Sequence, residues 1–173
     1  STLLASSAAS DVYKRQPFSV PRSVGQIPLY YNKKAPQSHD YVEMSASPLY
    51  PFGYGLSYTS FDYSDLHLSA LMPRSFEISF KVRNTGKYDG EEVAQLYLRD
   101  EYASVVQPLK QLKHFARFYL KRGEEREVKF ILSEEDFSLV DRNLKKIVEP
   151  GTFQIMIGAA SNDIRLQTKV EIK

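Results

Sequence analysis

Short runs of alternating apolar and polar residues constrain this chain more than any other feature of its sequence. In the clearest run, Phe76, Ile78, Phe80 and Val82 alternate with charged or polar residues. A period of two places the two sets on opposite faces of an extended strand, so that one face is buried and the other meets water. The run therefore predicts a half-buried β-strand whose apolar side chains lie in a core.

The same pattern recurs from residue 61 to the end of the chain, with turn sequences such as NTGKYDG and KRGEE between the runs. SEEDF predicts a single helical turn, because a serine N-cap precedes acidic residues. Further strands are expected at residues 61–71, around Ala94, Leu96 and Leu98, at 112–120 with Ala116, Phe118 and Leu120 on one face, around Val128, Phe130 and Leu132, around Phe153, Ile155 and Ile157, and at 164–172. About seven short strands, each with one polar face, predict an all-β fold: a two-sheet antiparallel immunoglobulin-like sandwich. We expect Leu96, Phe118, Phe130 and Ile155 to be largely buried in it, together with Phe76, Ile78 and Phe80.

The residues before the sandwich follow a different pattern. Residues 1–16 include SAASDVYKRQ, which resembles translated adapter sequence, so we expect them to be non-native and disordered. Residues 17–60 are rich in proline and lack a helical period. We expect an extended linker there, with at most one short strand at residues 27–31.

The composition excludes several classes of protein. The net charge is +2, and 23 basic residues are interspersed with 21 acidic ones. A nucleic-acid-binding face needs clustered basic residues, so no nucleic-acid partner is expected. Cysteine is absent, which excludes disulfides and thiolate metal sites. No apolar run approaches the roughly 20 residues that a membrane-spanning helix needs.

One stretch, PLYPFGYGLSY at residues 48–58, is called here the aromatic segment. It combines four rings with two glycines, and these six residues are our candidate site: Tyr50, Phe52, Gly53, Tyr54, Gly55 and Tyr58. Four rings carry too much apolar surface for an ordinary solvated loop, so we expect them to pack against a partner surface. The alternative is that the rings stack on sugars.

Residues for catalysis are badly placed. The acidic residues cluster at turns: Glu134, Glu135 and Asp136; Glu124, Glu125 and Glu127; and Asp89, Glu91 and Glu92. A glycosidase needs two carboxylates that face each other across a cleft. We expect these acids to be solvated turn charges with ordinary pKa values, and we predict no catalytic residue and no cofactor.

The three histidines give no metal site either. They are His39, His67 and His114. Asp65 and His67 are two residues apart on an expected strand, so they would share a face and could form half of a metal site. A third ligand is missing from the pattern, and we expect a surface pair. No metal is therefore predicted.

Long motifs in a fixed order carry a resemblance to a known family. They are PLYPFGYGLSYTSFDYSDL, VRNTGKYDGEEVAQLYLRD, QPLKQLKHFARFYLKRGEEREVKFILSEEDFSLVD and VEPGTFQIMIGAASNDIRL. Together they resemble the C-terminal end of family 3 glycoside hydrolases, the β-glucosidase and β-xylosidase group. PRSVGQIPLYYN resembles the last stretch of the α/β sandwich domain that precedes it in such enzymes.

The resemblance implies a domain organisation. Residues 17–60 would be the end of the α/β sandwich domain and the linker, and residues 61–173 would form a fibronectin type III-like domain. The nucleophile's motif and the acid/base of the family have no counterpart here, so the resemblance carries over no catalytic residue. One departure is that Leu144 and Lys145 stand where the family commonly has a glycine and an aromatic residue, which affects the packing of one hairpin.

Two hypotheses for function follow. In the first, the chain is a structural, domain-stabilising module, its partners are the upstream catalytic domains of the same parent chain, and carbohydrate is met through the parent enzyme. In the second, the chain is an independent carbohydrate-binding or adhesive module. Binding would need an exposed row of rings, whereas docking needs the rings gathered in the linker. The resemblance implies a periplasmic or secreted location.

Overall fold

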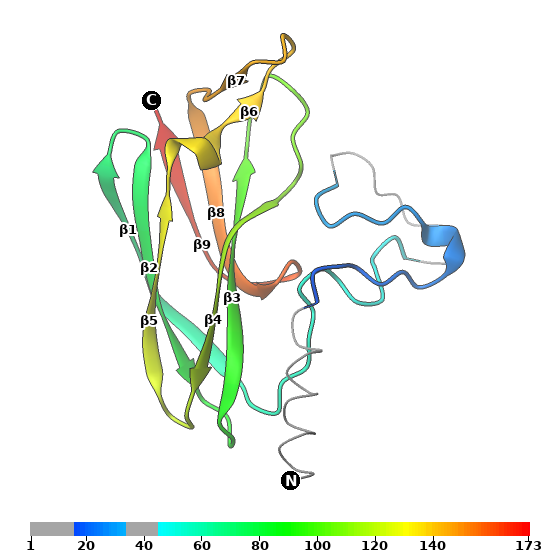
Figure 1. Cartoon of the computed structure of the whole chain (residues 1–173), viewed down its shortest axis with the longest axis vertical. Coiled ribbons are helices and arrows are strands. Elements are labelled where there is room, and N and C mark those ends of the chain that lie inside the picture. The colour runs from blue at the N-terminus through cyan, green and yellow to red at the C-terminus, as the bar shows by residue number, and fades with distance from the viewer. Residues whose placement is uncertain (1–15, 34–44) are drawn as a thin grey trace.

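The computed structural model describes residues 16–33 and 45–173, and Figure 1 shows the arrangement of their elements. A 3-10 helix, η1, precedes the strands, and a second one, η2, follows the fifth strand. The elements are η1 (Val24–Gln26), β1 (Phe61–Met72), β2 (Ser75–Asn84), β3 (Gly90–Asp100), β4 (Gln111–Leu120), β5 (Glu125–Leu132), η2 (Glu134–Phe137), β6 (Leu139–Val140), β7 (Lys146–Ile147), β8 (Gly151–Ala160) and β9 (Asp163–Ile172). No helix in the described ranges is long and apolar enough to cross a membrane.

Seven of the strands build two antiparallel sheets that pack face to face. One sheet has the order β1-β2-β5 and the other the order β4-β3-β8-β9, while β6 and β7 form a separate two-stranded ribbon. The ribbons in Figure 1 lie in two layers, with β1, β2 and β5 in one and β3, β4, β8 and β9 in the other. The predicted all-β sandwich is confirmed.

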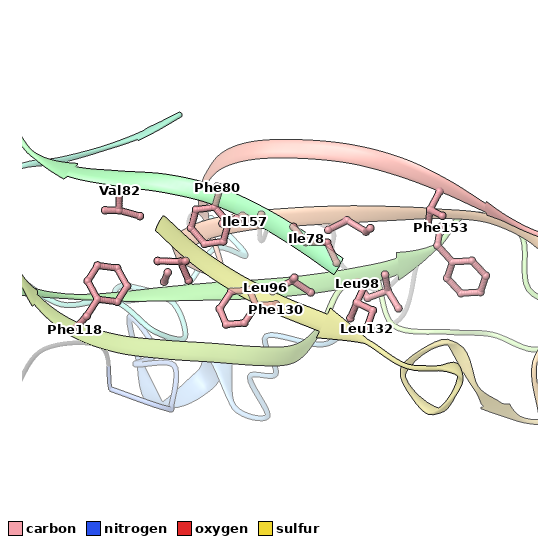
Figure 2. Close-up of a cluster of buried hydrophobic side chains, with 14 of the residues drawn as sticks. Ile78, Phe80, Val82, Leu96, Leu98, Phe118, Phe130, Leu132, Phe153 and Ile157 are labelled. Carbon is pink, nitrogen blue, oxygen red and sulfur yellow. The ribbon is translucent and has the colours of Figure 1, made fainter. Parts of the chain in front are cut away.

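The core between the sheets is made by the alternating residues. Side chains from both sheets point toward one another in Figure 2, among them Phe80 of β2 and Leu96 of β3. Six of the seven residues expected to be buried are at most 7% exposed: Ile78, Phe80, Leu96, Phe118, Phe130 and Ile155. Phe76 is only partly buried, because it lies at the margin of the core with its ring edge-on to Phe137.

The turn after β5 forms as expected. Ser133 is the N-cap of η2, and the Asp136 carboxylate accepts hydrogen bonds from the Ser133 backbone N–H (2.9 Å) and hydroxyl (3.0 Å). This reciprocal arrangement satisfies backbone groups that a helix start leaves without partners. SEEDF therefore gives one helical turn, of the 3-10 type.

The one short strand that the sequence allowed at residues 27–31 does not form. Extended pairing near it is limited, in the described part, to an isolated bridge between Val20 and Tyr50. Pro28 has no N–H to donate, and residues 29–33 instead reach across to the loop before β4, where the Leu109 N–H donates to the Lys33 carbonyl oxygen (3.1 Å).

The hairpin with the unusual Leu144 also has a distinctive backbone. Leu144 has a φ of 61°, in the left-handed region that favours glycine, and its side chain is 87% exposed. The Asp141 carboxylate stabilises this loop by accepting the backbone N–H groups of Asn143 and Lys145, both at 2.8 Å. The resemblance pointed to a glycine here, and the φ angle supplies the reason.

Candidate functional site: an aromatic segment packed on the four-stranded sheet

The aromatic segment runs beside the four-stranded sheet, on the side away from β1 and β2 in Figure 1. Backbone hydrogen bonds attach it at its centre. The Ser161 N–H, in the β8–β9 turn, donates to the Phe52 carbonyl oxygen (2.9 Å), and the Gly53 N–H donates to the carbonyl oxygen of Gln16 (2.9 Å). Because both polar groups of the peptide between Phe52 and Gly53 are paired, this part of the segment has a defined position.

The Phe52 ring belongs to a small cluster of aromatic side chains. It stacks on Tyr31 with ring centroids 4.1 Å apart, and Tyr31 in turn meets Tyr97 of β3 edge-on at 6.3 Å. The Tyr31 hydroxyl oxygen accepts the Leu112 N–H at 3.4 Å. Two stretches far apart in sequence, around Tyr31 and around Phe52, therefore share one contact on the sheet.

Gly53 makes the closest approach to the sheet. Its φ is +77°, and a Cβ built on it would lie 2.5 Å from Oε1 of Gln95. Two hydrogen bonds hold the Gln95 side-chain amide in place. Its Nε2 donates to the Ala159 carbonyl oxygen (2.9 Å), and its Oε1 accepts from the Tyr97 hydroxyl. Glycine is required here both for its backbone conformation and for lack of space.

The packed segment explains why β3 is buried on both faces. Residues 94–98 are all buried, although alternation would leave two of them facing water. Leu96 and its alternate neighbours face the core, while Gln95 and Tyr97 face the opposite way, beneath the segment. This second interface was not predicted from the sequence. The signal was the nearly unbroken run AQLYL, typical of a strand covered on both sides.

The other half of the aromatic segment stays open. Tyr50 and Tyr54 stack at 4.9 Å, and beside them lies an apolar groove of about 570 Å³. The groove, called here the linker groove, is lined by Gln16, Phe18, Val20, Tyr50, Pro51, Tyr54, Gly55, Leu56, Ser57 and Tyr58. Leu56 is 76% and Tyr58 77% exposed.

The six candidate residues therefore divide into two sets. Phe52, through its backbone carbonyl oxygen, and Gly53 contact this chain's own sandwich. Tyr50, Tyr54, Gly55 and Tyr58 border the linker groove. The structure brings all six together along one segment, but it turns the two sets in different directions.

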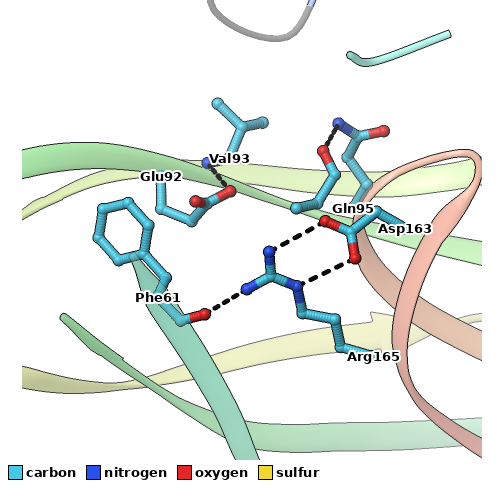
Figure 3. A network of polar contacts seen from close by, with 7 residues as sticks. Phe61, Glu92, Val93, Gln95, Asp163 and Arg165 are labelled. Carbon is cyan, nitrogen blue, oxygen red and sulfur yellow. Dashed lines mark hydrogen bonds and ion pairs between the residues drawn. The ribbon is translucent and has the colours of Figure 1, made fainter. Parts of the chain in front are cut away.

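A polar network lies where the segment enters β1, and Figure 3 shows it. Arg165 of β9 forms an ion pair with Asp163 (2.9 Å) and donates a hydrogen bond to the Phe61 carbonyl oxygen. Its guanidinium also lies 5.0 Å from the Tyr63 ring centroid. Burial alone would lower the pKa of Arg165, but hydrogen bonding to Asp163 and nearby negative charge, including Glu92, raise the pKa above its ordinary value. Through Arg165, the network connects the first residues of β1 to β9.

Glu92 corrects the prediction that the acids are solvated. Its side chain is 1% exposed, and Oε1 accepts the Val93 N–H at 3.1 Å (Figure 3). Asp100 departs as well, because partial burial raises the pKa of its carboxyl group. Tertiary packing at the two ends of β3 buries Glu92 and partly buries Asp100, and nothing in the local sequence indicated it.

The remaining candidates stay at the surface. Asp65 and His67 are exposed, and Asp65 pairs with Lys81 at 3.0 Å. A bulge between Ser64 and His67, with a φ of 53° at Asp65, breaks the alternation on which a shared face depended. His114 lies 3.4 Å from Asp136, and His39 falls outside the described residues. Within residues 16–33 and 45–173, no three acidic or histidine side chains gather as a metal site.

Comparison with known proteins supports the same class of domain. Residues 92–161, from β3 to the β8–β9 turn, match the family of fibronectin type III-like domains. The two sheets, with their three and four antiparallel strands, have the architecture of that class. The chain thus contains a fibronectin type III-like domain.

Relatives define the larger family. A β-xylosidase of Formosa agariphila is 43% identical over 87% of this chain and 22% of its own length, and a periplasmic β-glucosidase of Salmonella typhimurium is 42% identical over 86% and 21%. The crystal structure of a β-glucosidase from Listeria innocua in complex with glucose superposes with a TM-score of 0.81, at 34% identity, over 90% of this chain and 24% of that one. The chain belongs with the fibronectin type III-like domains of the family 3 β-glucosidases and β-xylosidases, and spans about a fifth of the length of these relatives.

Proposed function

We propose that this chain is the structural, domain-stabilising module of a larger family 3 glycoside hydrolase, and that the aromatic segment docks it to the catalytic domains that precede it. The division of the aromatic segment carries this proposal. Phe52 and Gly53 hold the segment on the sandwich. Tyr50, Tyr54 and Tyr58 line an apolar groove that is open to a neighbouring domain. A segment that is fixed on one side and apolar on the other suits a joint between two bodies.

The parent enzyme would act on carbohydrate, in the manner of the β-glucosidases and β-xylosidases to which this chain is similar. Its catalytic residues would belong to the preceding domains, and this module would contribute none. A periplasmic or secreted location is proposed with it, since one relative is a periplasmic β-glucosidase.

A chimera tests the docking role. This chain, from residue 17 onward, replaces the matching 21% of the Salmonella typhimurium enzyme, and limited proteolysis measures how firmly the module is held. We expect Tyr54→Ala with Tyr58→Ser to speed cleavage at the linker several-fold, because apolar surface at the joint is lost. Tyr102→Ser, which alters a tyrosine that is 83% exposed and outside the groove, is the matched control. Equal cleavage of both variants and the unsubstituted chimera would rule out docking through the groove.

A further inference from the structure

A second exposed aromatic surface lies on β4, outside the aromatic segment. β4 is an edge strand of the four-stranded sheet, and its inward residues Phe118 and Leu120 are buried. On the opposite face Phe115 is 68% and Tyr119 51% exposed. They are four residues apart, hence about 13 Å along the strand, with Arg117 between them. We call Phe115, Arg117 and Tyr119 the β4 strip.

Neighbouring side chains hold two members of the β4 strip in place. Arg117 forms an ion pair with Glu91 on the adjacent strand, with its Nε 3.0 Å from the carboxylate. The Tyr119 hydroxyl donates to Asp89 at 3.0 Å. Fixed side chains lose little conformational entropy when a partner covers them, so this surface is prepared for contact.

The β4 strip is continuous with the aromatic segment. Phe115 is the register partner of Gln95, which is the residue that Gly53 contacts. A surface that reaches the segment from the N-terminal side would therefore meet Phe115 beside it. The two apolar areas, the linker groove and the β4 strip, are connected by one part of the same sheet.

The outer face of the three-stranded sheet is different. Lys81 there pairs with Asp65 (3.0 Å) and Glu125 (3.5 Å), and Lys129 pairs with Glu77 (3.4 Å). A partner that covered these ion pairs would remove water from charged groups that are now solvated, which costs free energy. The β4 strip also holds one ion pair, Arg117–Glu91, but it sets two exposed aromatic rings beside that pair.

We propose that the β4 strip is a second docking surface for the preceding catalytic body, so that the four-stranded sheet faces that body and the three-stranded sheet faces water. This rests on the proposed function and adds the orientation of the module to it. Two observations favour this occupant. Relatives extend about five times the length that this chain matches, and the strip adjoins the segment through which they would continue. Aromatic residues and arginine are also the side chains that most often anchor protein interfaces.

Single cysteines test the orientation, because this chain has no cysteine of its own. Phe115→Cys reports on the β4 strip, Ile131→Cys on the three-stranded sheet, where Ile131 is 54% exposed, and Tyr58→Cys on the linker groove. The rate of reaction with a maleimide is measured for each variant in this chain alone and in the Salmonella chimera, after subtraction of the chimera's own thiols. Should the chimera fail to fold, the same substitutions go to the aligned positions of the intact Salmonella enzyme.

We expect the thiol at position 115 to react about tenfold or more slowly in the chimera, while the thiol at position 131 keeps its rate, because only the first is covered. Protection at 58 without protection at 115 would overturn this inference and leave the proposed function standing. Absence of protection at both positions would overturn both. Protection of the thiol at position 131, and not of that at position 115, would show that the three-stranded sheet faces the catalytic body, and would overturn the inference. If position 115 is protected only when soluble xylan or β-glucan is added, the strip is a carbohydrate-binding surface and the docking inference is wrong.

Discussion

Replacing Gly53 by alanine tests whether the aromatic segment is part of the folded sandwich. The added Cβ would lie 2.5 Å from Oε1 of Gln95, so one of the two must move. Gln95 can move only by breaking its hydrogen bonds with Ala159 and Tyr97, which leaves buried polar atoms unpaired. That costs about 1–3 kcal/mol, and moving the segment instead gives up its packing, at a similar overpacking cost.

The left-handed backbone adds to this cost. At φ +77° any residue with a Cβ is disfavoured by about 1–2 kcal/mol. Gly123 has the same φ of +77° but nothing within 4 Å of its Cβ position, so Gly123→Ala measures the backbone cost alone. We expect Gly53→Ala to lower the free energy of unfolding by about 2–5 kcal/mol, and Gly123→Ala by about 1–2 kcal/mol.

Urea unfolding followed by circular dichroism gives both values, with the slope as a check that the same surface is exposed. A double-mutant cycle with Gln95→Ala isolates the contact: removing the Gln95 amide should restore part of the stability that Gly53→Ala loses, but none of what Gly123→Ala loses. Equal losses at the two glycines, with no coupling to Gln95, would refute the argument that the segment packs tightly on β3.

Four further predictions concern the sandwich and its loops. Phe80→Ala should cost about 3–5 kcal/mol of unfolding free energy, because a ring that is 1% exposed leaves a cavity; a cost below about 1 kcal/mol would contradict the core assignment. Leu144→Gly should raise the unfolding free energy by up to about 1 kcal/mol by relieving the φ of 61°, and a loss would contradict that account. Hydrogen bonds from the Lys145 and Asn143 backbone lower the pKa of Asp141 from its ordinary 3.8, so this carboxylate stabilises the fold above that pH and the benefit disappears as the pH falls below it. The stability difference between the unsubstituted chain and Asp141→Ala in urea titrations should therefore shrink below about pH 4, and a constant difference would be inconsistent with it. Finally, this chain alone should release no product from aryl β-glucosides or β-xylosides, whereas measurable turnover would show that it carries catalytic residues.

Much of the fold could be predicted from alternation because burial in a sandwich is periodic. In β2, Ile78, Phe80 and Val82 are buried and the residues between them are more exposed, because a residue's face depends only on its place in the strand. The single turn at SEEDF was equally local, since a capping serine and an acidic residue three positions later satisfy each other. Local sequence could only allow for a short strand at residues 27–31, because a strand needs a partner and local sequence does not say whether one is present.

The candidate site was predicted as a segment but not as an arrangement. Composition alone indicated that Tyr50, Phe52 and Tyr54 must pack against something. That Phe52 packs on Tyr31, while Tyr50 and Tyr54 border a groove, depends on contacts between residues about 20 or more positions apart.

Sequence by itself determined most of the strands and the sandwich class, because both follow from interactions within a few residues. Only the tertiary structure decided that Gly53 lies on Gln95, that β3 is buried on both faces and that Glu92 is shielded from water. The physical reason is that these features arise where chain segments distant in sequence meet, and a side chain's solvent exposure is set by everything that packs over it.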